Sequence, residues 1–413
     1  MRVTTVFNRI LGLIQASVCS VEFTDQGLVL GVARRRRRRY HCPCGFATRA
    51  RYDTSRRRWR HLDFGATKVW LEATIVRLDC PTCGVRTETV PWARPGARHT
   101  RDFQDVLGWL AQRMDKTSVA RLLRCSWEAV DRAVKGVVAD HLDDARLNDL
   151  YRIGVDEISY KRGHSYLTIV CDHDTGRVVW VATDRSKKAF DDFFTALGPD
   201  RAAQLQAITM DGSTIYAPVA AERAPQATIC LDPFHIIKWT NEALEKVYAS
   251  HPPPKPPREV KPSSTAPTRT WRRLRGALRS GRENLDPDRR ALINALRRHR
   301  YMLWRAWDLK EKLRDLYRTT ARHQARAHLK AWITDALRSR ITPMANLALR
   351  LRRHFNQIAA AVELGLSNSR AEGINSKIRV IQRRGYGHPS PDSLTAMIHL
   401  CLGGIRLSLP TQT

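Results

Sequence analysis

Three carboxylates occupy positions where they could bind divalent metal ions. Asp156 closes the short apolar segment "IGVD", and Asp211 closes the segment "AITMD". Glu372 lies in "SRAEGINSKIRVIQRR", whose apolar spacing predicts a helix. Converging carboxylates repel one another unless cations neutralise them, and their hard oxygens suit Mg²⁺ or Mn²⁺. Two such ions would activate an attacking water or hydroxyl and stabilise the leaving oxygen. If the three side chains meet, they predict a site for phosphoryl transfer.

Each of these acids also has a structural explanation. A single acid at a strand end is more often a solvated terminus than a metal ligand. Ser369 stands three residues before Glu372, which is the spacing of a helix capping box. Asp232 competes with Asp211 because "ATICLD" also ends a strand, and His235 follows as a packing residue, a proton carrier or a DNA contact. We expect Asp232 and His235 to support the site from its edge.

The segment 150–245 has the pattern of an α/β sheet. Strands are predicted at 152–156, 166–171 and 177–182, then a helix at "KKAFDDFFTALG", a strand ending at Asp211, a helix at 214–223 and a strand ending at Asp232. This is the order of an RNase H-like sheet, in which the first and fourth strands are neighbours. Asp156 and Asp211 would then lie together, and a helix on that face would add Glu372. Glu157 should point to the opposite face, because strand side chains alternate.

A second group of residues could hold a zinc ion in a segment spanning 40–95. The motifs "CPCG" and "CPTCG" flank the alternating strand pattern "KVWLEATIVRL", as in a zinc ribbon. Thiolates paired on tight turns supply four tetrahedral ligands. The predicted zinc ligands are Cys42, Cys44, Cys80 and Cys83. Because "CPCG" is one residue shorter than the usual C-x-x-C, a strained pair or substitution by His41 remains open. Some of these cysteines could instead be ordinary small buried residues.

The segment 100–145 predicts a helix-turn-helix. Two apolar helical patterns flank a turn at 124–126, and Ser126 fits the N-cap of the second helix. That helix would enter the major groove of DNA, although a plain helical hairpin has the same pattern. The predicted DNA contacts are Arg121, Arg124, Trp127, Arg132 and Lys135, with Arg370, Lys377 and Arg379 on the Glu372 helix.

The overall composition indicates a polyanionic partner. Lys and Arg number 71 against 40 Asp and Glu, giving a formal net charge of +31. Nucleic acid is the simplest such partner. No apolar run is long enough to cross a membrane, and the first residues lack the features of a signal peptide. Nine unevenly placed cysteines suit a reducing compartment with a metal site. We therefore expect a cytoplasmic protein with no membrane partner.

The fold predicted for the 413 residues is multidomain α/β. An RNase H-like mixed sheet is interrupted by an all-helical insertion and preceded by a small zinc ribbon and a helix-turn-helix. The Pro-rich stretch "HPPPKPPREVKPSSTAPTRT" opens the insertion, whose tryptophans are expected mainly in a helical core. The predicted segments are 1–39 with its arginine run Arg34–Arg39, 40–95, 100–145, the first catalytic part 150–245, the insertion 246–362 and the last catalytic part 363–413.

Three blocks resemble one family, the DDE transposases of the ISL-three group of bacterial insertion sequences. They are "VDEISYKRGHSYLTIVCDHDTGRVVWV", "ITMDGSTIYAPVAAERAPQATICLDPFHIIKWTNEALEKV" and "SNSRAEGINSKIRVIQRRGYGH". The resemblance covers about residues 40 to 405 and includes the order of the segments. It implies catalysis by Asp156, Asp211 and Glu372 with Mg²⁺, on double-stranded DNA at the transposon's terminal inverted repeats and at a target. Because two ends must be joined, it also implies a homodimer or higher oligomer on DNA. The short "CPCG" departs from the family's usual C-x-x-C.

Two other functions fit parts of the pattern. A DNA-binding regulator with an inactive RNase H-like domain would share the zinc, the helix-turn-helix and the charge, but it need not retain three acids. A structure-selective nuclease would not need the N-terminal DNA-reading modules. The combination favours a transposase that cleaves strands and transfers the freed 3′-hydroxyl.

Overall fold

The computed structural model describes residues 2–34, 39–161, 165–212, 215–251, 266–318, 321–366 and 369–409. Most of the arginine run and of the Pro-rich stretch therefore lies outside the described residues. The chain separates into two compact units. The first contains residues 1–143 and 380–413, and the second contains residues 144–379. This division runs through the segment 363–413 that the sequence analysis kept as one piece.

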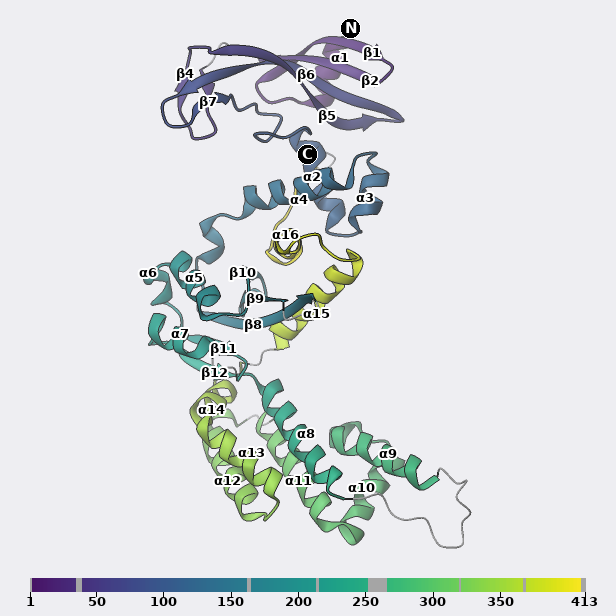
Figure 1. The fold of residues 1–413 in the computed structure, drawn as a ribbon, viewed down its shortest axis with the longest axis vertical. Helices are drawn as coiled ribbons and strands as arrows, with labels where there is room; N and C mark the ends of the chain where they lie inside the picture. The colour runs from purple at the N-terminus through teal and green to yellow at the C-terminus, as the bar shows by residue number, and fades with distance from the viewer. Residues whose placement is uncertain are drawn as a thin grey trace. The chain divides into compact units, whose positions relative to one another are not determined.

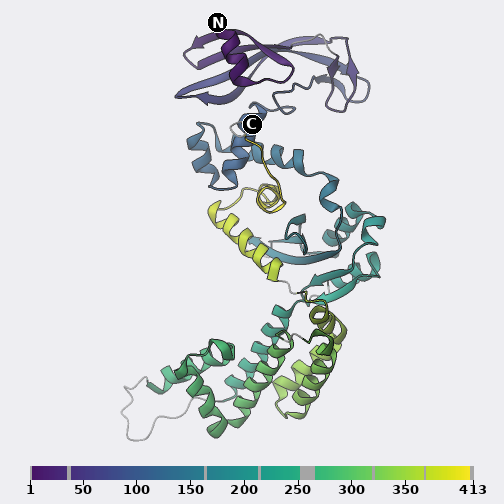
Figure 2. The same ribbon diagram turned by 180° about the vertical axis from the view of Figure 1, so that it is seen from behind.

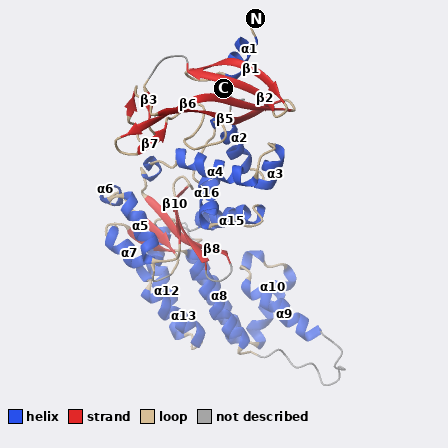
Figure 3. Ribbon diagram, turned by 45° about the horizontal axis from the view of Figure 1, so that its top comes forward, coloured by secondary structure: helices blue, strands red, loops and turns tan. Residues whose placement is uncertain are grey.

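The first unit is built on a five-stranded sheet. Its strands are β1 (Ala16–Thr24), β2 (Gly27–Arg34), β5 (Asp53–Phe64), β6 (Thr67–Cys80) and β7 (Gly84–Thr87), in the order β1-β2-β6-β5 with β7 also paired to β6. Figure 3 shows the long β5 and β6 in red. Helix α1 (Val3–Leu11) precedes the sheet, and the small pair β3 (Tyr40–His41) and β4 (Ala47–Thr48) forms a knuckle. The sequence analysis did not predict β1 and β2, which extend the sheet of the zinc-ribbon segment.

The helical part of the first unit joins two distant stretches of sequence. Helices α2 (Arg101–Ala111), α3 (Lys116–Leu122) and α4 (Trp127–His141) form the predicted helix-turn-helix. Helix α16 (Pro391–Leu402), near the end of the chain, packs against α4. Gln112 donates a hydrogen bond to the carbonyl of Leu400 at 2.8 Å, and Arg384 donates to the carbonyl of Gln112 at 2.9 Å. The C-terminal stretch thus completes the helix-turn-helix module.

The second unit contains the predicted mixed sheet. Its strands are β8 (Arg152–Lys161), β9 (Ser165–Asp172), β10 (Val178–Thr183), β11 (Ala207–Met210) and β12 (Thr228–Leu231). Their order is β10-β9-β8-β11-β12, with β8, β9 and β10 antiparallel and β8, β11 and β12 parallel. The first and fourth strands of the unit are therefore neighbours, which confirms the RNase H-like strand order.

Helices cover both faces of this sheet. On one face, α5 (Lys187–Leu197) and α7 (Tyr216–Arg223) bury a cluster of phenylalanines against the strands, and the short α6 (Pro199–Ala202) follows α5 (Figure 1). Helix α14 (Phe355–Glu363) packs on β12 through small apolar residues. The first part of α15 (Ser369–Arg384) lies alongside β8, as Figures 1 and 2 show.

The helical insertion follows the last strand. It consists of α8 (Pro233–Ala249), α9 (Ala266–Arg279), α10 (Pro287–His299), α11 (Tyr301–Leu316), α12 (Ala325–Arg338), α13 (Thr342–Arg353) and then α14. Trp332 is buried in its core, and Trp271, Trp304 and Trp307 pack against that core. The tryptophans are thus structural, as predicted. None of the helices in the described ranges is long and apolar enough to span a membrane.

Candidate active site, zinc centre and DNA interface

Three aspartates form a row at one edge of the second unit's sheet. Strand β11 is parallel to both β8 and β12, so the carboxyl ends of β11 and β12 lie beside the middle of β8. The predicted strand ended at Asp156, but β8 continues to Lys161, so Asp156 lies inside the strand. Two residues past the last β8–β11 pair, Asp211 is level with Asp156. One residue past the last β11–β12 pair, Asp232 is level with Asp211. The strand order thus brings together the acids that the sequence singled out.

Asp156 is held by two hydrogen bonds and lacks a cationic partner among the described residues. Its Oδ1 accepts from the backbone N–H of Glu157 at 2.8 Å, and its Oδ2 accepts from the side-chain amide of Asn375 at 2.7 Å. Burial raises the pKa of Asp156 to about 6, and repulsion from Asp211 adds to the effect. A raised pKa of this kind marks a carboxylate that would gain from a nearby cation.

Glu157 also belongs to this electrostatic cluster. Its carboxylate pairs with Arg185, with 2.5 Å between Oε2 and Nε. Burial raises the pKa of Glu157 to about 7, and the charges of Asp211 and Asp156 contribute despite Arg185. The sequence analysis assigned Glu157 to the opposite face of the strand. At the rim of a sheet, however, Asp211 lies within electrostatic reach of both acids, so alternation along β8 does not isolate Glu157.

The side chain of Asp232 stabilises the first turn of α8. Its side chain is 2% exposed and caps α8 by accepting from the backbone N–H of Phe234 at 3.1 Å. Its other oxygen accepts from Nδ1 of His235 at 3.1 Å, and this hydrogen bond raises the pKa of His235. Asp211 is only partly buried. Since Asp232 is almost fully buried whereas Asp211 is partly accessible, Asp211 fits the role of a metal ligand better.

Glu372 stands in the first turn of α15 and faces the same cluster. Burial raises the pKa of Glu372, and the charges of Asp232 and Asp156 raise it further. Its Oε1 is buried without a hydrogen-bond partner among the described residues. The side chain of Ser369 lies outside the described part of the chain, so the capping box remains a prediction.

The donor set suits a hard divalent cation. Carboxylate oxygens are the ligands that Mg²⁺ and Mn²⁺ prefer, and the buried unpartnered oxygen of Glu372 is a free ligand atom. The acids are not drawn together as tightly as a bound ion would hold them. Within the described ranges they do not form a group whose ligand atoms all lie within 4.8 Å of one another.

The four cysteines do form such a group. The sulfur atoms of Cys42, Cys44, Cys80 and Cys83 all lie within 4.8 Å of one another. The Cys44 and Cys80 sulfurs are 3.6 Å apart, close to the separation of about 3.8 Å expected for tetrahedral Zn–S bonds of about 2.3 Å. His41 is exposed and outside the group, so the short "CPCG" motif supplies two thiols without it.

Backbone hydrogen bonds in the knuckle shape the turn around these thiols and shift their pKa values. The carbonyl of Cys42 accepts from Gly45, whose φ of 98° suits glycine, and the N–H of Cys42 donates to Phe46. The Phe46 backbone N–H lowers the pKa of Cys44 to about 7, and the neighbouring thiols contribute to this shift. A hydrogen bond with Cys44 raises the pKa of Cys83 to about 12. A zinc ion would remove this competition for protons by binding all four as thiolates.

The predicted DNA contacts on the helix-turn-helix fall into two classes. Arg121 and Arg132 are exposed. Arg124 instead pairs with Asp63 and donates to the carbonyl of Ala66 at 2.8 Å, which ties the turn to the β5–β6 hairpin. The first class is available to phosphates, whereas Arg124 has a structural role in the unbound protein.

The recognition helix also contains a buried charge cluster. Asp131 pairs with Lys116 and with Lys135, the latter at 2.9 Å, and accepts from the hydroxyl of Ser393 at 2.7 Å. The Lys116 ammonium lies 5.0 Å from the ring centroid of Trp127. Lys135 and Trp127, predicted as DNA contacts, therefore both have partners within the unit.

Among the predicted contacts on α15, Lys377 and Arg379 are exposed. The side chain of Arg370 lies outside the described residues.

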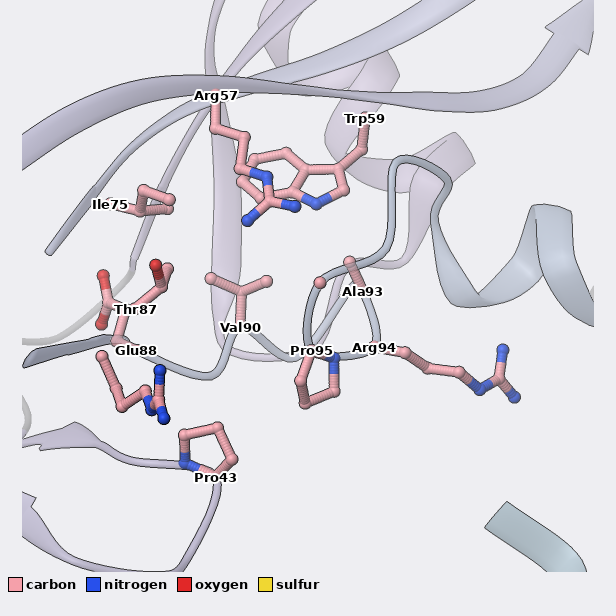
Figure 4. Close-up of a pocket in the computed structure, with 12 residues that line it drawn as sticks. Pro43, Arg57, Trp59, Ile75, Thr87, Glu88, Val90, Ala93, Arg94 and Pro95 are labelled. Atoms are coloured by element: carbon pink, nitrogen blue, oxygen red, sulfur yellow. The ribbon is translucent and has the colours of Figure 1, made fainter. Parts of the chain in front are cut away.

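A small pocket of about 200 Å³ lies beside the zinc knuckle in the first unit (Figure 4). Arg57 lies over Trp59 at one side, with 5.6 Å from its guanidinium carbon to the ring centroid, and Pro43 lies at the other side. Arg94 points away from the pocket toward Asp105 and other polar partners. The pocket is thus bordered by one arginine-covered aromatic ring.

The contact between Asn375 and Asp156 was not predicted from the sequence. The spacing Glu372-x-x-Asn375 places both residues on one helix face, and that was the available signal. The hydrogen bond to Asp156 could not be read from the sequence, because 219 positions separate the two residues.

Comparison with known proteins agrees with this arrangement. Family models match residues 153–398, described as a transposase; residues 88–138, described as the helix-turn-helix domain of transposase family ISL3; and residues 43–83, described as the zinc-finger of transposase IS204/IS1001/IS1096/IS1165. The chain is 40% identical over 372 residues to the "Transposase for insertion sequence element IS1557" of Mycobacterium tuberculosis, covering 86% of this chain and 83% of the relative. It is 28% identical over 351 residues to the "Transposase for insertion sequence element IS1001" of Bordetella parapertussis, covering 84% of each.

Proposed function

The chain belongs to the ISL3 family of transposases, and we propose that it cleaves DNA strands at the terminal inverted repeats of an insertion sequence and joins them to a target. The observation that carries this proposal is the row formed by Asp156 within β8 and by Asp211 and Asp232 just past the ends of β11 and β12, with Glu372 facing it from α15. Burial raises the pKa of Asp156, Glu157 and Glu372 at this place, which is costly for folding alone, so the group is better explained by a bound cation.

In this proposal Asp156, Asp211 and Glu372 hold the divalent cations, which are Mg²⁺ or Mn²⁺. When bound, the cations activate the nucleophile and neutralise charge on the scissile phosphate. Asp156 is already oriented by its two hydrogen bonds. Asp232 fixes one nitrogen of His235, which leaves the other ring nitrogen to donate to DNA or to carry a proton. Lys377 and Arg379 would contact phosphates beside the site.

The first unit would recognise the DNA ends. Zn²⁺ bound by the four cysteines would hold the knuckle, and α4 would enter the major groove with Arg121 and Arg132 on phosphates or bases. Release of Arg124 or Lys135 from its internal partner would add further contacts. Since two ends must be joined, we propose a homodimer or higher oligomer on DNA.

The test is cleavage of a labelled duplex that carries the element's own terminal repeat. Reactions contain Mg²⁺ or omit it, and the enzyme is wild type, Asp156→Asn, Asp211→Asn, Glu372→Gln or Asp232→Asn. The first three variants should lose more activity than the roughly 10–100-fold that removal of a supporting residue costs. Asp232→Asn should retain measurable cleavage.

Two outcomes would contradict parts of the proposal. Loss of cleavage in Asp232→Asn with activity kept in Asp211→Asn would reassign the second ligand. Specific binding of the repeat by every protein, with no cleavage by wild type in Mg²⁺ or Mn²⁺, would instead favour a DNA-binding regulator whose RNase H-like domain is inactive.

A further inference from the structure

Asn375 connects the helix of Glu372 to the first aspartate. Its Nδ2 lies 2.7 Å from Oδ2 of Asp156. An ionised carboxylate only accepts hydrogen bonds, so the amide must present its NH₂ group to Asp156. The amide oxygen is therefore directed away from Oδ2 of Asp156.

That amide oxygen has no partner of its own. Oδ1 of Asn375 is buried without a hydrogen bond in the described part of the chain, as is Oε1 of Glu372 three residues earlier. Residues three apart lie on the same helix face. A buried acceptor without a hydrogen bond destabilises the folded state, and both of these neighbouring oxygens lack one. A ligand that both oxygens can bind would remove that cost.

We propose that Asn375 is a positioning residue for the divalent-cation site. Its N–H group fixes the carboxylate of Asp156 against α15, and its oxygen accepts from the hydration shell of the cation. This inference rests on the proposed function, because it assumes that Asp156 and Glu372 bind the cation. It adds a neutral residue to a site so far described by its acids.

The insertion contains a matched control. Asn241 in α8 also has a buried Oδ1 without a hydrogen-bond partner among the described residues, and no contact to Asp156 is seen for it. Removal of the Asn241 amide imposes a similar packing change within the same unit. If Asn375 had a purely structural role, its substitution and that of Asn241 would have the same effect on cation binding.

The experiment measures Mn²⁺ binding to the full-length zinc-loaded protein through the electron paramagnetic resonance signal of free Mn²⁺. Wild type is compared with Asn375→Ala, Asn241→Ala and Asp156→Asn. Asn375→Ala should weaken Mn²⁺ binding about 10-fold or more, as loss of a supporting partner does at other metal sites. Asn241→Ala should bind as wild type does, and Asp156→Asn should bind more weakly than Asn375→Ala.

The outcomes separate this inference from the function beneath it. Unchanged Mn²⁺ affinity in Asn375→Ala, with affinity lost in Asp156→Asn, overturns the role of Asn375 alone. Unchanged affinity in both variants overturns the cation site as well. If Asn375→Ala melts at a lower temperature than Asn241→Ala, Asn375→Leu takes its place, because it keeps the branch at Cγ, leaves no cavity and lacks both polar groups.

Discussion

Buried acids are treated in opposite ways in the two units. In the first unit Asp131 is buried, and burial alone would raise its pKa. Hydrogen bonds from Lys116, Ser393 and Lys135 outweigh burial and hold the pKa of Asp131 at about 2. In the second unit, burial raises the pKa of Asp156 to about 6, and repulsion from Asp211 adds to it. The acid in the DNA-binding unit is a completed ion pair, whereas the acid at the sheet edge lacks its counter-charge.

The two candidate metal centres also differ in how far their ligands are brought together without a metal. The zinc ligands come from two turns joined by one hairpin, and their sulfur atoms are already clustered. The carboxylates come from the middle of β8, the end of β11 and a helix more than 150 positions further along the chain. In the described ranges their ligand atoms do not all lie within 4.8 Å of one another. We infer that zinc is part of the fold, whereas the divalent cation belongs to the reaction.

Removal of zinc should therefore unfold part of the protein, whereas removal of Mg²⁺ should not. A zinc-selective chelator should unfold the knuckle, because structural zinc contributes about 10 kcal/mol or more of binding free energy to such sites. Omission of Mg²⁺ should leave the second unit folded. Hydrogen exchange of residues 40–48 and 80–87 measures the first effect, and exchange of β8 and β9 measures the second.

Two cysteine variants provide the control for this experiment. Cys80→Ser should reproduce the effect of the chelator, whereas Cys125→Ser, at a half-buried cysteine outside the group, should not. Equal protection of the knuckle with and without zinc would show that the sheet alone holds the four thiols in place.

Much of this architecture follows from local sequence pattern. Apolar alternation and strand order predicted the sheet, and the sheet predicted that Asp156 and Asp211 would be neighbours. The cysteine turns predicted the zinc group. Such features need only short-range regularities and the rule that parallel strands end at the same edge.

The contacts that distinguish the two units were not predictable in this way. Asp131 and Ser393 are 262 positions apart, and neither shows in its local pattern that it has a buried polar partner. Strands β1 and β2, which form a local hairpin, were missed, and the pairing of β2 with β6 joins segments on either side of the knuckle. The commitment of Asp232 to helix capping also depends on the geometry of one turn.

Asp131→Asn should destabilise the first unit strongly. It leaves the buried Lys116 with an uncompensated charge, and breaking a buried pair from one side costs about 3–5 kcal/mol. Urea unfolding followed by hydrogen exchange of α4 measures the loss. Asp53→Asn, which removes an exposed pair with Arg77, should cost far less, because solvent screens exposed charges. Equal costs would show that the buried cluster is no more than a surface ion pair.

Asp156→Asn should have the opposite sign in the second unit. Without divalent cations it removes a charge that the fold disfavours and should stabilise the unit by about 1–2 kcal/mol at pH 7.5. Asp191→Asn, which breaks an exposed pair with Arg223 in the same unit, should stabilise nothing. The gain should disappear when saturating Mn²⁺ is present, because the wild-type carboxylate then has its counter-charge. A destabilised Asp156→Asn would contradict the view that this acid is strained by burial.

The smallest effect concerns pH, for which the units should again respond in opposite directions. In the first unit, burial lowers the pKa of His61 and His99 to about 4, with Arg60 adding repulsion. An unfolded histidine binds a proton below about pH 6.5, so the stability that neutral burial contributes is present above that pH and declines as pH falls toward 4.

In the second unit, burial raises the folded pKa of Glu157 to about 7 and that of Asp156 to about 6, and their unfolded values are near 4. Protonation therefore favours the folded state, and stability should rise as pH falls from 7 toward 4. Between pH 7 and pH 5 we expect the stabilities of the two units to change with opposite signs. Denaturant-dependent hydrogen exchange of β6 and β8 measures them. Glu157→Gln should reduce the gain in stability of the second unit at low pH, and His61→Gln should reduce the loss of stability of the first unit. If the stabilities of both wild-type units changed with pH in the same direction, the contrast between paired and unpaired buried charges would be wrong.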